Sequence, residues 1–191
     1  TNPGDQSWAP LREFGDLTVY DRTPPERIVE RARGARIVLT NKTPLGGEVL
    51  GELEALEFIS LLATGHDNVD VERARELGIP VSNVPEYGTE SVAEHTIGLI
   101  LELAHRMGEH ARAVDRGEWT QCPDFTFWNG PVVELAGRTL GIVGFGRIGR
   151  RVGRIGSALG MEVVASTGST EPEPDFEPFE HVETSEVLER S

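Results

Sequence analysis

The feature that most constrains this chain is a glycine motif, Gly-Phe-Gly-Arg-Ile-Gly, at residues 144–149. An apolar run at 139–143 predicts a strand directly before the motif, and helical periodicity at 147–159 predicts a helix directly after it. Glycine-rich turns are common, so the motif alone is weak evidence. A strand that leads through such a motif into a helix is the context in which these glycines bind a dinucleotide.

Each glycine has a separate expected task. Gly144 permits the tight turn, Gly146 lets the backbone approach a pyrophosphate, and Gly149 lets the helix pack close to the strand. The first N–H groups of the helix have no partner within it, so they and the helix dipole attract phosphate. The alternative is a glycine-rich turn that binds no ligand. The strand and helix on either side favour a nicotinamide dinucleotide site.

The choice between NAD and NADP stays open at this stage. An NAD site usually carries an acidic residue about 20 positions after the motif, where it binds ribose hydroxyls. Here the segment after the next predicted strand, 161–165, begins Ser166-Thr167 and contains neither an acid nor an arginine. Thr167 stands where an Asp would indicate NAD, and its hydroxyl suits a ribose or a phosphate. Glu171 and Glu173, just beyond, would repel a phosphate.

The rest of the chain alternates strands with helices, which predicts the α/β class with a parallel sheet covered on both faces. A long helix with an apolar stripe is expected at 91–116, followed at 117–135 by a connecting segment that packs over its neighbours. Predicted strands lie at 17–20, 36–40, 58–62 and 79–83, and predicted helices at 24–33, 47–56, 69–77 and 184–190, whereas 171–178 reads as a surface loop. The stripe comprises Val92, Thr96, Leu99, Ile100, Leu103 and Met107.

Composition narrows the partners and the compartment. A net charge of −14 argues against nucleic acid, since an acidic surface repels phosphate backbones. No apolar run approaches the roughly 18 residues that span a bilayer, and no signal peptide is recognisable. The lone cysteine, Cys122, excludes an internal disulfide and is expected to be a packed thiol in a reducing cytoplasm. The single lysine, Lys42, is compatible with salt adaptation or with a GC-rich genome.

Four segments carry a resemblance to a known family: 63–70 (ATGHDNVD), 78–85 (GIPVSNVP), 91–95 (SVAEH) and 134–149 (ELAGRTLGIVGFGRIG). Together they resemble the D-isomer-specific 2-hydroxyacid dehydrogenases. Within that family, the segment Leu-Thr-Asn-Lys-Thr-Pro-Leu at 39–45 and the stretch 119–128 are similar to glycerate dehydrogenases, also called hydroxypyruvate reductases.

The resemblance implies a two-domain enzyme. Residues 1–90 would form a flavodoxin-like substrate domain, 91–117 an interdomain helix, and 118–191 the first part of a Rossmann NAD(P)-binding domain. The implied reaction is reduction of 2-keto acids such as hydroxypyruvate or glyoxylate, with NAD or NADP as cofactor, by a homodimer. The alternatives are a dinucleotide sensor or scaffold of the same fold without turnover, and, less favoured, a flavin-binding protein.

Individual roles follow from the resemblance. The backbone N–H groups of Thr64 and Gly65 would hold the substrate carboxylate, and Thr64 would also approach the cofactor. Arg147 and Ile148 would contact the pyrophosphate through their backbone, and Lys42 would lie near the substrate pocket. Two free amides at a strand-to-helix turn do form an anion nest. An ordinary turn and a surface lysine are the competing interpretations.

The family's catalytic arginine, acid and histidine all fall beyond residue 191. None of the five histidines matches the proton donor, and His95 is the best local candidate for a polar contact. Only two strands of the cofactor sheet are predicted, which would leave strand edges exposed. We therefore expect these residues to be part of a longer polypeptide.

Overall fold

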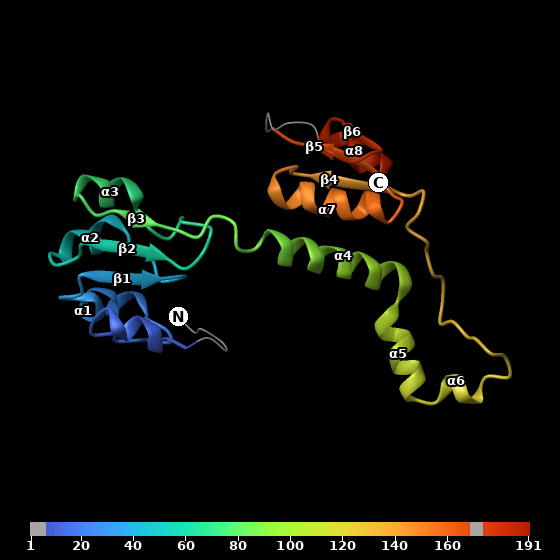
Figure 1. The fold of residues 1–191 in the computed structure, drawn as a ribbon, viewed down its shortest axis with the longest axis horizontal. Coiled ribbons are helices and arrows are strands. Elements are labelled where there is room, and N and C mark those ends of the chain that lie inside the picture. Colours follow the sequence, from blue (N-terminus) through green and yellow to red (C-terminus); the bar gives the residue numbers. More distant parts are fainter. Residues whose placement is uncertain (1–6, 169–173) are drawn as a thin grey trace. The chain divides into compact units, whose positions relative to one another are not determined.

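The computed structural model describes residues 7–168 and 174–191. The chain divides into two compact units, Thr1–Tyr87 and Gly88–Ser191, each built on a three-stranded parallel sheet with helices (Figure 1). The predicted α/β class is confirmed. In the described part of the chain, no helix is long and apolar enough to cross a membrane.

The first unit has strand order β1-β2-β3. Its core gathers around the buried residues Ile59 and Leu61 of the middle strand, which pack with Leu45 and Leu50. The strands are β1 (Ile37–Thr40), β2 (Phe58–Leu61) and β3 (Val81–Ser82), and the helices are η1 (Ala9–Glu13), η2 (Pro25–Arg27), α1 (Ile28–Ala32), α2 (Gly47–Glu52) and α3 (Val71–Glu76).

Two predictions for the first unit are wrong in detail. Residues 17–20 do not form a strand, because the segment belongs to neither of the sheets formed by the described residues. The predicted strand at 79–83 shortens to the two residues of β3, and Pro80 has no N–H to extend the ladder. The prolines at 24 and 25 open the predicted helix as a 3-10 turn, η2, before α1 begins.

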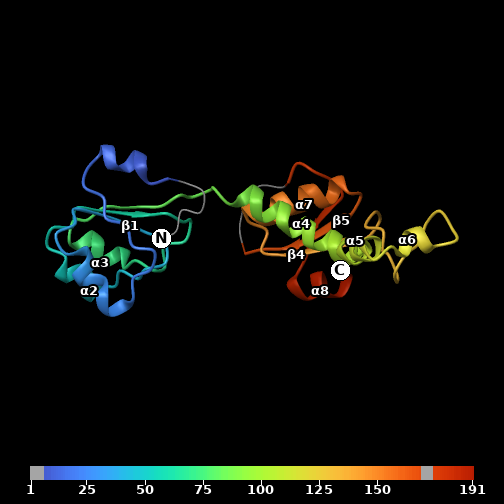
Figure 2. The ribbon, with the colours of Figure 1, turned by 90° about the horizontal axis from the view of Figure 1, so that it is seen from below.

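The second unit has strand order β4-β5-β6, and α7 packs against α4 (Figure 1). Side chains alternate along β4 (Thr139–Val143): Leu140 and Ile142 face glycines of α7, whereas Gly141 faces Val187 of α8. Helices α7 and α8 therefore cover opposite faces of the sheet (Figure 2). The other elements are α4 (Thr89–His105), α5 (Met107–Asp115), α6 (Glu118–Gln121), α7 (Arg147–Ala158), β5 (Glu162–Ser166), β6 (Phe179–His181) and α8 (Thr184–Arg190).

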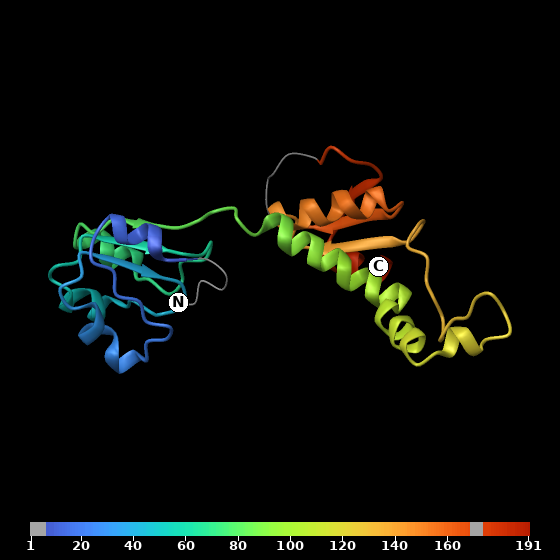
Figure 3. The same ribbon diagram turned by 60° about the horizontal axis from the view of Figure 1, so that its bottom comes forward.

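The predicted helix at 91–116 is two helices. Arg106 adopts the left-handed conformation (φ 53°, ψ 40°), so α4 ends there and α5 sets off in a new direction (Figure 3). The second sheet also has a strand that the sequence analysis missed, β6, which gives three strands instead of the predicted two. A strand of three residues after a proline-rich loop has too little pattern to be recognised.

Most of the predicted apolar stripe is exposed, although Ile100 packs against the core. Leu99 and Leu103 are largely exposed, whereas Ala93 and Ile97 on another face are buried against the sheet and α7. The segment 117–135 likewise does not pack over its neighbours throughout, since it forms α6 and leaves Phe125 91% exposed.

Candidate cofactor and substrate sites

The glycine motif forms the turn from β4 into α7. Gly144 has φ +96°, a conformation that side-chain-bearing residues rarely adopt, and its N–H donates to the Ser166 carbonyl on β5 at 2.8 Å. This bond continues the β4–β5 ladder by one residue beyond the pair Val143 and Ser166. The turn is therefore fixed to the carboxyl edge of the sheet by backbone alone.

The N-terminus of α7 is open to an anion. Gly146 is its N-cap residue, with no side-chain cap, and no acidic residue stands in the first turn. A Cβ built on Gly146 would meet no atom within 4 Å, so the space in front of this backbone is free. The exposed Arg147 and the 43% exposed Ile148 form the first turn. An uncapped helix N-terminus behind an open glycine suits a pyrophosphate.

Gly149, the third glycine of the motif, allows α7 to pack closely against the strand before it. Gly149 is buried, and a Cβ there would collide with the Gly144 carbonyl oxygen and lie 3.2 Å from Ile142 Cγ2. One turn further along α7, a Cβ on Gly153 would lie 2.8 Å from Phe176 Cζ. The close contact of α7 with β4 and the Gly144 turn therefore depends on Gly149 having no side chain, and its close contact with Phe176 depends on Gly153.

The end of β5, where an acid was sought in the sequence, carries hydroxyl groups. Ser166 Oγ and Thr184 Oγ1, on the first residue of α8, are 2.5 Å apart and share a hydrogen bond. Thr167 follows the strand and is half-buried. Ser169, Glu171 and Glu173 lie outside the described residues.

The candidate carboxylate loop follows β2 in the first unit. Thr64 and Gly65 are exposed, and within the described residues neither backbone N–H has a hydrogen-bond acceptor. The loop is held from behind: Thr64 Oγ1 donates to the Val84 carbonyl at 2.8 Å, and Asn83 Nδ2 donates to the Thr64 carbonyl at 2.8 Å. Two free amides on a fixed loop can receive an anion.

A second loop, after β1, is fastened beside the first. Asn68 Nδ2 donates to the carbonyls of Asn41 and Thr43, both at 3.1 Å, and Leu45 pairs with Val69 in an isolated bridge. These bonds bring the exposed Lys42 to the same edge of the sheet as the Thr64 loop. The tying role of Asn68 was missed, because an asparagine in a turn ordinarily only shapes that turn.

Two histidines and the cysteine belong to the second unit. His95 is exposed on α4, whereas His110 is structural: its Nδ1 lies 2.9 Å from the Arg106 carbonyl, and its Nε2 accepts from the Asn129 N–H. Cys122 is half-buried, with Sγ 3.5 Å from the Thr126 carbonyl. Among the described residues, no cluster of three or more His, Cys, Asp or Glu is placed to hold a metal.

The pKa shifts belong to surface ion pairs. Hydrogen bonds from Arg36 lower the pKa of Glu57, and hydrogen bonds from Arg116 and then Asn129 lower that of Glu118. The pKa of Arg190 is raised by its bonds to Glu186 and Glu180. These pairs stabilise charge on the surface and do not contribute to either candidate loop.

Comparison with known protein families decides the assignment. A family model described as D-isomer specific 2-hydroxyacid dehydrogenase, catalytic domain, matches residues 1–190. The chain belongs to this family. The family resemblance inferred from the sequence is therefore confirmed.

Named relatives agree with the dehydrogenase family. A hydroxypyruvate reductase from Blautia hydrogenotrophica is 44% identical over 193 residues, which cover 100% of this chain and 60% of the relative. A glycerate dehydrogenase from Methylorubrum extorquens is 38% identical over 82% of this chain and 51% of its own length. The chain thus spans between half and three fifths of these dehydrogenases.

Solved structures give the same fold. A putative NAD-binding D-isomer specific 2-hydroxyacid dehydrogenase from a Polaromonas species superposes with a TM-score of 0.82 at 30% identity, covering 96% of this chain and 58% of its own. A D-lactate dehydrogenase from Aquifex aeolicus, complexed with NAD and lactic acid, has a TM-score of 0.71 at 28% identity, over 85% of this chain and 48% of its own.

Proposed function

We propose that the protein is an NAD(P)-dependent oxidoreductase that reduces 2-keto acids such as hydroxypyruvate or glyoxylate to D-2-hydroxy acids. The observation that carries this proposal is the open, uncapped N-terminus of α7 behind Gly146, in a chain of the 2-hydroxyacid dehydrogenase family. The names of the reductase and the glycerate dehydrogenase among its relatives support the substrate class.

In the second unit, the proposed task is to hold the cofactor. The N–H groups of Arg147 and Ile148 would bind the pyrophosphate, with Gly144 shaping the turn, Gly146 leaving room and Gly149 anchoring the helix. Thr167, at the end of β5, would bind the adenosine ribose or its phosphate. When bound, the nicotinamide supplies the hydride that reduces the keto carbon.

In the first unit, the proposed task is to hold the substrate. The free N–H groups of Thr64 and Gly65 would bind its carboxylate, Thr64 would also approach the cofactor, and Lys42 would add positive charge nearby. A proton must reach the carbonyl oxygen as the hydride reaches carbon. We expect the arginine, acid and histidine for this step to lie outside residues 1–191, since the relatives are longer.

The cofactor preference is left to measurement. Ser166 and Thr167 present hydroxyl groups, and neither an acid nor an arginine stands between Ala165 and Gly168 to select one cofactor. Steady-state rates with NADH and NADPH at equal concentration determine it directly.

We further propose that the protein is a homodimer. Exposed apolar side chains of α4 and α5, including Leu99, Leu103 and Met107, support this proposal, because a second copy could cover them. Replacing the 82% exposed Leu103 by Glu should convert the dimer into monomers in sedimentation, without unfolding the helix.

The decisive experiment uses the full-length gene product. Hydroxypyruvate should cause loss of NADH or NADPH absorbance, and Gly146→Ala should weaken cofactor binding at least tenfold, about 1.4 kcal/mol. The variant's Cβ has room and its backbone (φ −82°) accepts alanine, so the fold should persist. Gly98→Ala, at an equally open glycine of α4, is the matched control.

Cofactor binding without turnover on any small 2-keto acid would support the sensor instead. Equal cofactor affinity in Gly146→Ala and wild type would contradict the proposed site.

A further inference from the structure

Asn83 and Val84 form hydrogen bonds to the two peptide groups that carry the free amides of the candidate carboxylate loop. The Val84 N–H donates to the Ala63 carbonyl at 3.1 Å, and Asn83 Nδ2 donates to the Thr64 carbonyl at 2.8 Å. These carbonyls belong to two successive peptide groups, Ala63–Thr64 and Thr64–Gly65. The nitrogens of the same two groups are those of Thr64 and Gly65, the candidate donors to an anion.

The planar peptide group fixes the direction of the two free amides. Both peptide groups are trans, and in a trans peptide the C=O and N–H bonds point in opposite directions. Because both carbonyls face the segment 83–84, the N–H groups of Thr64 and Gly65 face away from it, on the same side of the loop. Two successive N–H groups that share a direction form an anion nest. The orientation of this nest therefore follows from bonds made on its opposite side.

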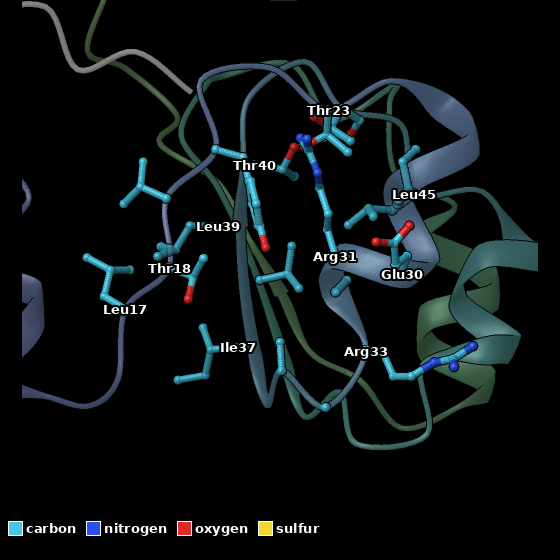
Figure 4. A pocket seen from close by; sticks show the side chains of 18 of the residues that line it. Leu17, Thr18, Thr23, Glu30, Arg31, Arg33, Ile37, Leu39, Thr40 and Leu45 are labelled. Atoms are coloured by element: carbon cyan, nitrogen blue, oxygen red, sulfur yellow. The ribbon is translucent and has the colours of Figure 1, made fainter.

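The first strand ends too early to accept hydrogen bonds from these amides. β2 lies between β1 and β3, so N–H groups that face away from the end of β3 point to the side of β1. β1 ends at Thr40, which lines the cavity of about 520 Å³ beside that strand (Figure 4). The loop after Thr40 carries the exposed Lys42. The side of the sheet edge that the amides face therefore also carries a positive charge, which suits an anion.

Of the two bonds from the segment 83–84, only the one from Asn83 depends on the identity of a side chain. The Val84 N–H is a backbone group that any residue except proline would supply. The bond from Asn83 Nδ2 also polarises the Thr64–Gly65 peptide group, which makes the Gly65 N–H a stronger donor. Thr64 Oγ1 donates in return to the Val84 carbonyl at 2.8 Å, so the two segments are joined in both directions.

We propose that Asn83 is a positioning residue: its side-chain amide holds the Thr64–Gly65 peptide group so that the Gly65 N–H meets the substrate carboxylate. This inference rests on the proposed function, because that function assigns the carboxylate to this loop. Asn83 acts from behind the loop and does not touch the substrate. The carboxylate is bound alike in the ground state and the transition state, so loss of the bond should raise KM and leave kcat unchanged.

Steady-state kinetics of the full-length gene product with hydroxypyruvate test this role. Asn83→Leu keeps the approximate size of the side chain and removes the donor. Its KM should rise about tenfold, which corresponds to about 1.4 kcal/mol, with kcat little changed. Asn83→Gln keeps an amide donor on a longer side chain and should recover part of the loss.

Ser82→Ala is the matched control. The Ser82 hydroxyl donates to Ser60 Oγ at 3.4 Å, so this variant also removes a side-chain bond between β3 and β2, one residue before Asn83. It leaves both peptide groups of the loop untouched, and KM should stay at the wild-type value.

A titration with oxalate, followed by NMR, separates the positioning role from the proposed activity. Oxalate carries the carboxylate of a 2-keto acid and has no keto carbon to reduce, so binding is measured without turnover. The backbone amide resonances of Thr64 and Gly65 should shift in the wild type. The dissociation constant should be about tenfold larger in Asn83→Leu.

Three outcomes overturn the role of Asn83. A lower kcat at unchanged KM in Asn83→Leu means that the side chain only stabilises the fold. Oxalate that does not bind, or that leaves the Thr64 and Gly65 resonances in place, means that the loop is not the anion site. Equal oxalate affinity in the wild type and Asn83→Leu means that the amides need no support. A wild type that reduces no keto acid but loses oxalate affinity in Asn83→Leu would contradict the proposed activity and support the positioning role.

Discussion

The two sheets of this chain have the same number of strands and are both parallel, yet their strands differ in how well they are buried. In the second, the central strand β5 buries Val163, Val164 and Ala165 between two covering helices. In the first, β1 is an edge strand, and its Ile37 is 59% exposed. The middle strand of the second sheet is therefore covered on both faces, whereas an outer strand of the first sheet leaves a large apolar side chain exposed.

The two candidate binding loops also differ in what holds them in place. The turn at Gly144 is held by backbone geometry and by the absence of side chains. The loop at Thr64 is held by side chains that reach distant carbonyls, from Asn83 and from its own hydroxyl to Val84. The Gly144 turn should therefore be destabilised by substitutions that add side-chain atoms, and the Thr64 loop by substitutions that remove them.

The largest effect is expected at Gly149. Gly149→Ala drives a Cβ into the Gly144 carbonyl, and separation of α7 from β4 should lower the free energy of unfolding of the second unit by about 3 kcal/mol. Urea denaturation measures this. Gly98→Ala, at an open helical position, should instead raise it by about 0.5–1 kcal/mol. Equal effects would remove the distinction between close-packed and open glycines.

Removal of the Asn68 side-chain amide tests how the Thr64 loop is held in the first unit. Asn68→Ala leaves two carbonyls without their donor, and we expect the first unit to lose about 1–2 kcal/mol in its free energy of unfolding. The neighbouring exposed Asp67→Ala serves as control. A rise in KM for the keto acid, with kcat little changed, should accompany the loss if the loop binds substrate. An unchanged stability would show that the two loops are not tied by Asn68.

A substitution at Arg150, in the second unit, should raise the free energy of unfolding instead of lowering it. Its Nε and Nη2 are buried without a partner in the described residues, and its guanidinium carbon lies 5.0 Å from the centre of the Phe145 ring. Arg150→Met keeps the packing and removes the orphaned donors, so thermal and urea unfolding should show a gain of about 1 kcal/mol. Arg154→Met breaks an exposed pair with Asp175 and should change little. A loss in Arg150→Met would indicate an unseen partner.

The smallest effect concerns the Arg36–Glu57 pair beside β1. Hydrogen bonds from Arg36 lower the pKa of Glu57, so this carboxylate stabilises the folded unit above its unfolded pKa, and the contribution disappears as pH falls through the folded pKa. Glu57→Gln should therefore flatten the acid limb of a stability–pH curve slightly, and high salt should mask the difference. Glu54→Gln is the control. A steeper loss of stability at low pH in Glu57→Gln than in the wild type would contradict this prediction.

The sequence was most informative where a structure depends on local rules. The motif at 144–149 carries its geometry in its glycines, and the structure shows the positive φ, the open N-terminus and the close packing that those positions predict. The alternation of strands and helices likewise predicted the α/β class.

Prediction failed where distant contacts decide. Residues 17–20 have the pattern of a strand, but a strand also needs a paired neighbour. Periodicity predicted the apolar stripe through Leu99 and Leu103, but it shows only that a face is apolar and not what covers it, and both side chains are exposed. The hydrogen bonds of Asn68 span 25 and 27 residues, which no local pattern reveals.

Arg106 sets the direction of α5 and α6, the helices that follow α4. Continued straight, the nine residues of α5 would lengthen the helix by about 14 Å, at about 1.5 Å per residue. The left-handed backbone at Arg106 redirects them, and Glu102 secures the new start by accepting from the Gly108 N–H. The angle of the bend at Arg106, and not the length of α4, therefore determines the position of Trp119 and of the rest of α6. Replacing Arg106 by alanine would tend to straighten it, whereas glycine would loosen it without changing its direction.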